Sequence, residues 1–157
     1  MTRRSERIGR SGEYLTCSVL ARESDTVTVM PHTSHADVIF EWKHKLYRCQ
    51  VKTVTHIEDR KKNWRFDIRK GITTTGRHYK KNEIDIIAMV NLEYQTICFK
   101  AFSDCQTAQI TIKDEIMKST NSIDSLKEAM ESIILATDGR QDKNESTSGT
   151  KKTAING

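Results

Sequence analysis

Three side chains of different chemical types lie close together in the first third of the chain: the acid Asp37, the amide Gln50 and the amine Lys52. Asp37 belongs to a mostly apolar run over residues 36–42, which a short polar turn separates from a second run over residues 45–54. If the two runs are antiparallel neighbours, the two-residue period of a strand places Gln50 and Lys52 on one face, near Asp37. Carboxylate oxygens suit Mg²⁺, and a lysine beside a metal-activated water suits phosphodiester hydrolysis. The spacing therefore predicts a metal-dependent hydrolytic site at one end of a small sheet.

The elements that would position these groups are a first helix, a series of strands and a last helix. Ser11 is a favourable N-cap, and the apolar stripe that follows it predicts a helix over residues 11–23 with Glu13 in its first turn. Apolar runs and alternating patterns predict strands over residues 27–31, 36–42, 45–54, 64–69, 84–90 and 96–102. An amphipathic pattern predicts a helix over residues 121–136. This order is typical of a mixed α/β (α+β) domain around one central sheet.

The length of 157 residues suits one packed domain, which we expect to span residues 11–136. Residues 1–10 contain four arginines and predict a basic N-terminal arm. Residues 137–157 are mostly polar and predict a disordered tail, because they offer little apolar surface to bury. The net charge of +5, from 26 Lys and Arg against 21 Asp and Glu, favours a polyanionic partner.

Several classes of protein do not fit the sequence. The four cysteines have no CxxC spacing, and no apolar run approaches the roughly 18 residues of a membrane span. The first residues lack the apolar stretch of a signal peptide. We therefore expect a reduced cytoplasmic protein that does not enter a membrane.

Cations are concentrated between residues 60 and 81, where nine Lys and Arg accompany a single acid, Asp67. Such a density beside the predicted site favours contacts with nucleic-acid phosphates. The predicted phosphate-binding residues are Arg60, Lys61, Lys62, Arg65, Arg69, Lys70, Arg77, Lys80 and Lys81. Arg65, Asp67 and Arg69 would share one face of a strand, as in β-ribbons that read the major groove.

The order of these motifs resembles the PD-(D/E)XK nuclease superfamily, and within it the group I intron-encoded homing endonucleases. Three matches carry the resemblance: Glu13 in the first helix, the Ala36-Asp37 pair in place of the proline-aspartate pair, and Gln50-Val51-Lys52 in place of the (D/E)XK triplet. The glutamine is a departure that removes one anion, and it resembles the QxK variant of the intron-homing branch. Tyr79 and Asp85 match a further Tyr-x₅-Asp stretch more loosely.

The resemblance implies a restriction-endonuclease-like core with Glu13, Asp37, Gln50 and Lys52 as the catalytic residues. It also implies a Mg²⁺ or Mn²⁺ ion held by Asp37, the backbone carbonyl of Val51 and Glu13. The implied partner is a long, specific double-stranded DNA target. Because one site cuts one strand, a double-strand break implies a homo-oligomer, either a dimer or a dimer of dimers.

Two other functions remain open at the level of sequence. One is a nuclease that is specific for four-way junctions, like the Holliday junction resolvases, which needs similar chemistry but recognises DNA shape. The other is a non-catalytic DNA-binding module on a degenerate nuclease fold, which Gln50 in place of an acid would permit.

Overall fold

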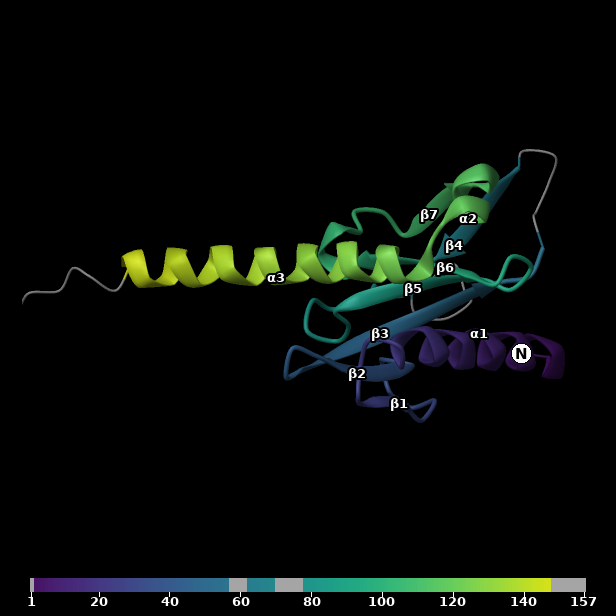
Figure 1. Cartoon of the computed structure of the whole chain (residues 1–157), viewed down its shortest axis with the longest axis horizontal. Coiled ribbons are helices and arrows are strands. Elements are labelled where there is room, and N and C mark those ends of the chain that lie inside the picture. Colours follow the sequence, from purple (N-terminus) through teal and green to yellow (C-terminus); the bar gives the residue numbers. More distant parts are fainter. Residues whose placement is uncertain (1, 57–61, 70–77, 148–157) are drawn as a thin grey trace, which may run out of the picture.

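The computed structural model describes residues 2–56, 62–69 and 78–147 of the chain (Figure 1). Its helices are α1 (Arg3–Leu20), α2 (Asp114–Ser119) and α3 (Ser122–Thr147), with a short 3₁₀ helix η1 (Phe102–Asp104). Its strands are β1 (Val27–Val29), β2 (Val38–Trp42), β3 (Lys45–Val54), β4 (Asn63–Asp67), β5 (Ile86–Asn91), β6 (Thr96–Ala101) and β7 (Gln109–Lys113). None of the helices in these ranges is long and apolar enough to cross a bilayer.

Five of the strands form one mixed sheet in the order β1-β2-β3-β5-β6, and β4 and β7 form a separate two-stranded sheet. Only the central pair of the large sheet, β3 with β5, is parallel. Strands β2 and β3 form a hairpin whose turn residues Lys43 and His44 both have positive φ angles, of 48° and 66°. The predicted fold class, a central mixed sheet flanked by helices, is confirmed.

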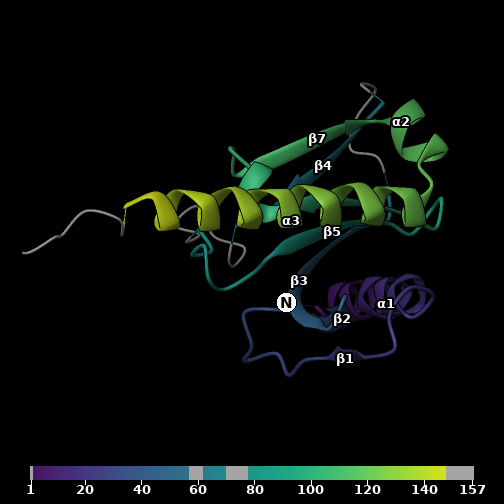
Figure 2. The same ribbon diagram turned by 60° about the vertical axis from the view of Figure 1, so that its left-hand side comes forward.

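The large sheet is the middle of three layers (Figure 2). Helices α1 and α3 pack on one face, where Leu20 and Met130 join the inward side chains of the sheet in one apolar core. The β4–β7 sheet and α2 cover part of the other face, where Trp64 and Met117 belong to a second core. Strand β5 is buried on both faces, since its alternate residues enter the two cores.

The first helix begins eight residues earlier than predicted. Its N-cap is Thr2, whose hydroxyl accepts a hydrogen bond from the Ser5 amide at 3.2 Å. Ser11 is therefore not a cap; its hydroxyl donates to the Arg7 carbonyl inside the helix, at 2.8 Å. Most of the predicted basic arm is helical because a single cap at Thr2 suffices to extend the helix through a polar sequence. Glu13 consequently lies in the middle of α1 and not in its first turn.

The last helix also continues beyond its predicted end at residue 136, as far as Thr147. Residues 137–147 of the predicted tail are thus helical, and residues 148–157 lie outside the described part. Extending an existing helix adds one hydrogen bond for each residue fixed, so a polar sequence continues it without burying apolar surface. Figure 1 shows α3 extending past the sheet, away from the start of α1.

Two elements near residue 110 were not predicted. Strand β7 completes the small sheet by pairing antiparallel with β4, and α2 follows it directly. The predicted strands at 27–31, 36–42, 64–69, 84–90 and 96–102 are present with ends that differ by one or two residues, and the strand at 45–54 has its predicted bounds.

Candidate functional site

The predicted acid Asp37 lies immediately before β2, at the point where this strand stops pairing with β3. Its backbone amide donates to the Cys49 carbonyl at 3.0 Å, which continues the antiparallel ladder by one residue. Its carboxylate oxygen Oδ2 accepts hydrogen bonds from the Gln50 side-chain amide at 2.6 Å and from the Val51 backbone amide at 2.8 Å. The structure therefore brings Asp37 and Gln50 together, as the sequence predicts.

The Val51 carbonyl faces the same edge of the sheet. Arg48 and Val54 accept backbone hydrogen bonds from Asp85 and Leu92, which lie on the β5 side of β3. Since successive strand residues direct their backbone groups to opposite neighbours, the amide and carbonyl of Val51 point toward the β2 side. Strand β2 no longer pairs with β3 there, so this carbonyl has no strand partner within the described residues and lies on the same side of β3 as the Val51 amide, which donates to Asp37.

Glu13 reaches this edge from α1, because the helix lies very close to β3 at Gly12. A Cβ atom on Gly12 would lie only 1.9 Å from the Thr53 hydroxyl oxygen, so no larger residue fits at this helix–sheet distance. Glu13 lines a cleft of about 470 Å³ together with Val51 and Lys52. The sequence predicts Glu13 at the site, but the close approach that places it there depends on a tertiary contact.

The two carboxylates of the site are partly removed from water. Burial, and then the charge of Asp37, raises the pKa of Glu13. Burial also raises the pKa of Asp37, while the Val51 amide, Lys52, His32 and Gln50 oppose this rise. Burial makes both acids harder to ionise, and the charge of Asp37 adds to this effect at Glu13. Such a pair is well suited to a bound cation, which would stabilise both anions.

Lys52 extends from the same strand and is held at two points. Its ammonium donates to the Arg69 carbonyl at 3.0 Å and lies 5.7 Å from the centre of the Tyr79 ring. Burial lowers the pKa of Lys52, and the charges of Asp37 and Asp67 offset part of this effect. The amine is therefore oriented, partly desolvated and electrostatically coupled to the acid site.

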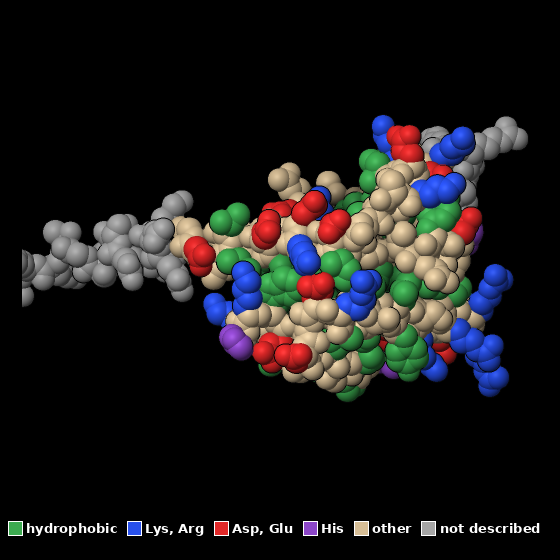
Figure 3. Space-filling view, viewed as in Figure 1, with side chains coloured by type: hydrophobic (Ala, Val, Ile, Leu, Met, Phe, Trp, Pro, Cys, Tyr) green, Lys and Arg blue, Asp and Glu red, His purple; other side chains and the backbone are tan. Residues whose placement is uncertain are grey.

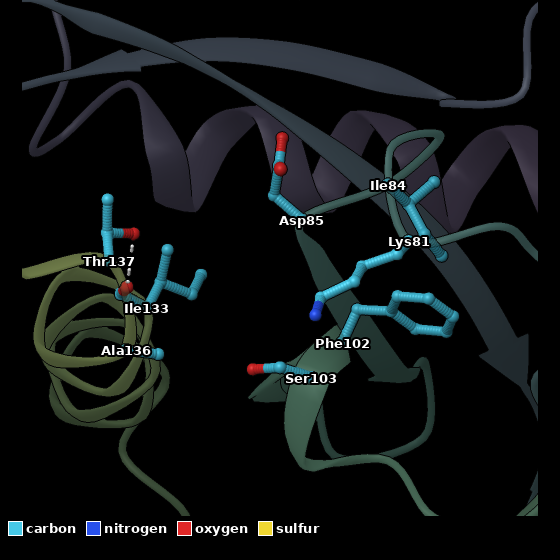
Figure 4. A pocket seen from close by; sticks show the side chains of 8 residues that line it. All are labelled: Lys81, Ile84, Asp85, Phe102, Ser103, Ile133, Ala136 and Thr137. Carbon is cyan, nitrogen blue, oxygen red and sulfur yellow. Dashed lines mark hydrogen bonds between the residues drawn. The ribbon is translucent and has the colours of Figure 1, made fainter. Parts of the chain in front are cut away.

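The two weaker sequence matches, Tyr79 and Asp85, lie in different places. Tyr79 belongs to the site: burial, followed by the charge of Asp37, raises the pKa of its phenol. Asp85 instead binds Arg48, accepting hydrogen bonds from its backbone amide at 2.8 Å and from its guanidinium at 3.0 Å. Figure 4 shows Asp85 beside a pocket between the start of β5 and α3, together with Lys81 and Phe102. Asp85 therefore joins β3 to the start of β5 through Arg48.

One residue near the acids was not predicted. His32 lies in the loop between β1 and β2, which is closed by a 2.8 Å hydrogen bond from the Met30 amide to the Asp37 carbonyl. Its charge opposes the raised pKa of both Glu13 and Asp37. The spacing of the histidines in the sequence does not predict this position, because the geometry of the loop alone brings His32 to the site.

The predicted phosphate-binding cations have several different environments. Arg65 lines the cleft, whereas Lys62, Lys80 and Lys81 are exposed outside it. The Arg69 guanidinium binds Asp67 through two hydrogen bonds and, with the Arg69 backbone amide, lowers the pKa of that acid to about 2. Arg60, Lys61, Lys70 and Arg77 lie outside the described residues.

The oxygen atoms at the edge fit a Mg²⁺ ion. No group of three or more His, Cys, Asp or Glu side chains among the described residues could hold a metal by itself. Mg²⁺ does not need such a group, since one or two carboxylates and several waters commonly hold it. Glu13, Asp37 and the Val51 carbonyl supply two carboxylates and one further oxygen.

Comparison with known proteins identifies the fold. No protein-family model matches the chain, and no curated protein matches its sequence. The fold is similar to the solved structure of a bacterial homing endonuclease, I-Ssp6803I, with a TM-score of 0.62 and 16% sequence identity. The similarity covers 87% of this chain and 97% of that chain. This chain has the fold of that nuclease. The predicted resemblance to a homing endonuclease is thus supported at the level of the fold, and the PD-(D/E)XK class stays a prediction.

Proposed function

We propose that this protein is a metal-dependent DNA endonuclease of the PD-(D/E)XK type that cuts a specific duplex target in the manner of a homing endonuclease. One observation carries the proposal: two partly desolvated carboxylates, Glu13 and Asp37, and the partly desolvated ammonium of Lys52 gather around β3, where Glu13 and Lys52 line a cleft that is open to solvent. Perturbed ionisable groups gathered in a cleft are typical of catalytic sites. The fold similarity to I-Ssp6803I agrees with this chemistry.

Each group at the edge has a definite role in the proposal. Glu13, Asp37 and the Val51 carbonyl would hold Mg²⁺ or Mn²⁺, which would offset negative charge on the scissile phosphate and lower the pKa of the attacking water. Lys52 would donate a hydrogen bond to the attacking water and offset the negative charge that develops on the phosphate oxygens. The side-chain N–H group of Gln50 would hold the Asp37 carboxylate in place, and the side-chain oxygen of Gln50 would face the attacking water.

The charges around the cleft support DNA as the substrate. In Figure 3, Lys and Arg lie at one corner formed by the start of α1 and, with acids among them, at a second corner over α2 and the β4–β7 sheet; further Lys and Arg lie in the middle and at the left of the view. The first corner contains the exposed Arg3, Arg4, Arg7 and Arg10 of α1. The cleft lies between α1 and β4, since Ser5, Glu13 and Arg65 all line it. A duplex backbone that entered the cleft would therefore have cations on both sides.

An assay of DNA cleavage tests this proposal directly. We expect the wild-type protein to nick supercoiled plasmid in Mg²⁺ or Mn²⁺ and to be inactive in EDTA. Asp37→Asn should abolish nicking, since the asparagine oxygen can keep both hydrogen bonds but the charge is lost. Asp124→Asn, an exposed change on α3, is the matched control and should cut like the wild type.

The binding of DNA separates the catalytic proposal from the alternatives. Asp37→Asn should bind duplex DNA as tightly as wild type or more tightly, because an anion near phosphate is removed. Nicking by this variant at more than a few per cent of the wild-type rate would place the active site elsewhere. Preferential cutting of a four-way junction over linear duplex in a competition assay would instead identify a resolvase. For a double-strand break we expect an even-numbered assembly, which sedimentation of the protein–DNA complex would measure.

A further inference from the structure

The small sheet formed by β4 and β7, here called the ribbon, has two faces of opposite character. Its inward face places Trp64, Phe66 and Ile112 in the second core. Its outward face consists of three directly opposed pairs: Asn63 with Lys113, Arg65 with Thr111, and Asp67 with Gln109. All six outward residues are polar or charged, and five of them are exposed.

Most of the outward face is unoccupied by other parts of the described chain. Asp67 is bound to Arg69 and is not available to a partner. Within the described residues, the side chains of Arg65, Gln109 and Thr111 make no hydrogen bond or ion pair. One face of the ribbon therefore presents a row of hydrogen-bonding side chains to solvent, while its other face is packed in the second core.

The ribbon is continuous with the candidate active site. Arg65 lies on the outward face of β4 and also lines the cleft that contains Glu13 and Lys52. Figure 2 shows the ribbon and α1 on opposite sides of the large sheet, with β3 between them. A duplex whose scissile phosphate lies at the cleft would therefore continue along the outward face of the ribbon.

We propose that the outward face of the ribbon enters the major groove and reads base pairs beside the cut, with Arg65, Thr111 and Gln109 as the specificity-determining residues. This inference rests on the proposed function and assigns the surface that selects its target. A two-stranded ribbon fits the major groove, where Arg pairs with guanine, Gln with adenine, and the Thr methyl contacts thymine.

The lysines at the end of the ribbon have a different role. Lys62, Lys113 and Lys118 line a hollow of about 540 Å³ at the junction of β4, β7 and α2, together with Asn63, Asp114 and Glu115. Compact ammonium groups at the border of a reading surface suit phosphate contacts, which position the protein without reading sequence. Base contacts are thus assigned to the middle of the ribbon, and phosphate contacts to its lysine-rich end.

Selection from a duplex pool with a randomised segment tests this assignment, with wild-type protein in EDTA so that binding proceeds without cutting. We expect Thr111→Ala and Gln109→Ala to lose the preference for a base at adjacent positions of the selected sequence. The ratio between preferred and substituted bases should fall by roughly tenfold to a hundredfold. Lys113→Ala should instead weaken all sequences alike and reduce the salt slope by about one unit.

Matched controls keep the test specific. Thr28→Ala on β1 and Gln106→Ala in the loop before β7 change exposed residues of the same types and should select the wild-type sequence. Thermal melting of every variant confirms that it is folded. An unchanged consensus for both Thr111→Ala and Gln109→Ala would overturn the inference, as would the absence of any consensus in the wild-type selection. A wild-type protein that selects a consensus but never nicks plasmid in Mg²⁺ would instead refute the proposed nuclease activity.

Discussion

The contact between Gly12 of α1 and Thr53 of β3 sets the distance between the helix that carries Glu13 and the strand that carries Lys52. In a Gly12→Ala variant, the new Cβ would lie 1.9 Å from the Thr53 hydroxyl oxygen and 2.9 Å from the Thr53 Cβ, whereas ordinary contact begins at 3.4 Å. Rotation of the threonine side chain removes the first conflict but not the second. The helix must therefore move away from the strand by at least about half an ångström.

The loss of stability in Gly12→Ala can be estimated by comparison with Gly9→Ala, whose added Cβ would meet nothing within 4 Å. Both changes gain about 1 kcal/mol from the helix propensity of alanine. Only Gly12→Ala also overpacks an interface, at a cost of about 1–3 kcal/mol. We therefore expect its melting temperature to lie roughly 2–12 °C below that of Gly9→Ala. Because Glu13 would move with the helix, plasmid nicking should fall by roughly tenfold to a hundredfold.

Urea unfolding and the nicking rate measure the two effects separately. Thr53→Ala in the Gly12→Ala background removes the hydroxyl and methyl contacts but retains Cβ, so we expect partial recovery of both quantities. Equal stability of Gly12→Ala and Gly9→Ala would refute the proposed steric limit. Reduced stability with undiminished nicking would show that catalysis does not depend on the position of Glu13.

Three further changes test other parts of the structure. Gln50→Glu should slow cleavage at equal Mg²⁺, because a carboxylate would replace the amide that donates to Asp37 at 2.6 Å; faster cutting than the wild type would contradict this role. Lys52→Met should abolish cleavage but keep or raise stability. Burial lowers the pKa of Lys52 in the folded state, so folding disfavours the charged form of this lysine. The stability advantage of Lys52→Met over the wild type should therefore shrink as pH rises toward the ordinary lysine pKa of 10.5. A difference in melting temperature between the two proteins that stays constant from pH 7.5 to 10.5 would contradict that reasoning. Lys43→Asn combined with His44→Gly should stabilise the protein by about 1–2 kcal/mol in urea unfolding, since both turn residues have positive φ angles; an unchanged midpoint would rule out strain at this turn.

The parts of the site that sequence predicts correctly are those set by local geometry. The β2–β3 hairpin has a two-residue turn, and the alternation of side chains along β3 fixes which residues share a face. The bounds of β3 and the proximity of Asp37 to Gln50 follow from these two facts. The predicted catalytic roles of these residues stay predictions until cleavage is measured.

The parts that sequence does not predict depend on contacts between distant segments. Strand β7 offers only five residues with two apolar side chains, and its identity as a strand depends on pairing with β4. The placement of Glu13 depends on the close approach at Gly12, and that of His32 depends on a loop closed by Asp37. The pairing of Arg69 with Asp67 likewise removes a cation that composition alone would assign to DNA.

The separation between the hairpin and the ribbon along the chain has a consequence for how the protein folds. Asp37 and Gln50 are 13 residues apart and are joined by a tight turn. Arg65 and Thr111 face each other across the ribbon only after the whole of β5 and β6 has intervened. Loop-closure entropy favours short-range pairs, so we expect the hairpin with its acid to gain amide protection before the ribbon does. Pulse-labelling hydrogen exchange measures this order, and earlier protection of β4 and β7 would contradict it. Asp37 and Gln50 would then be brought together before the surface that we assign to target recognition has formed.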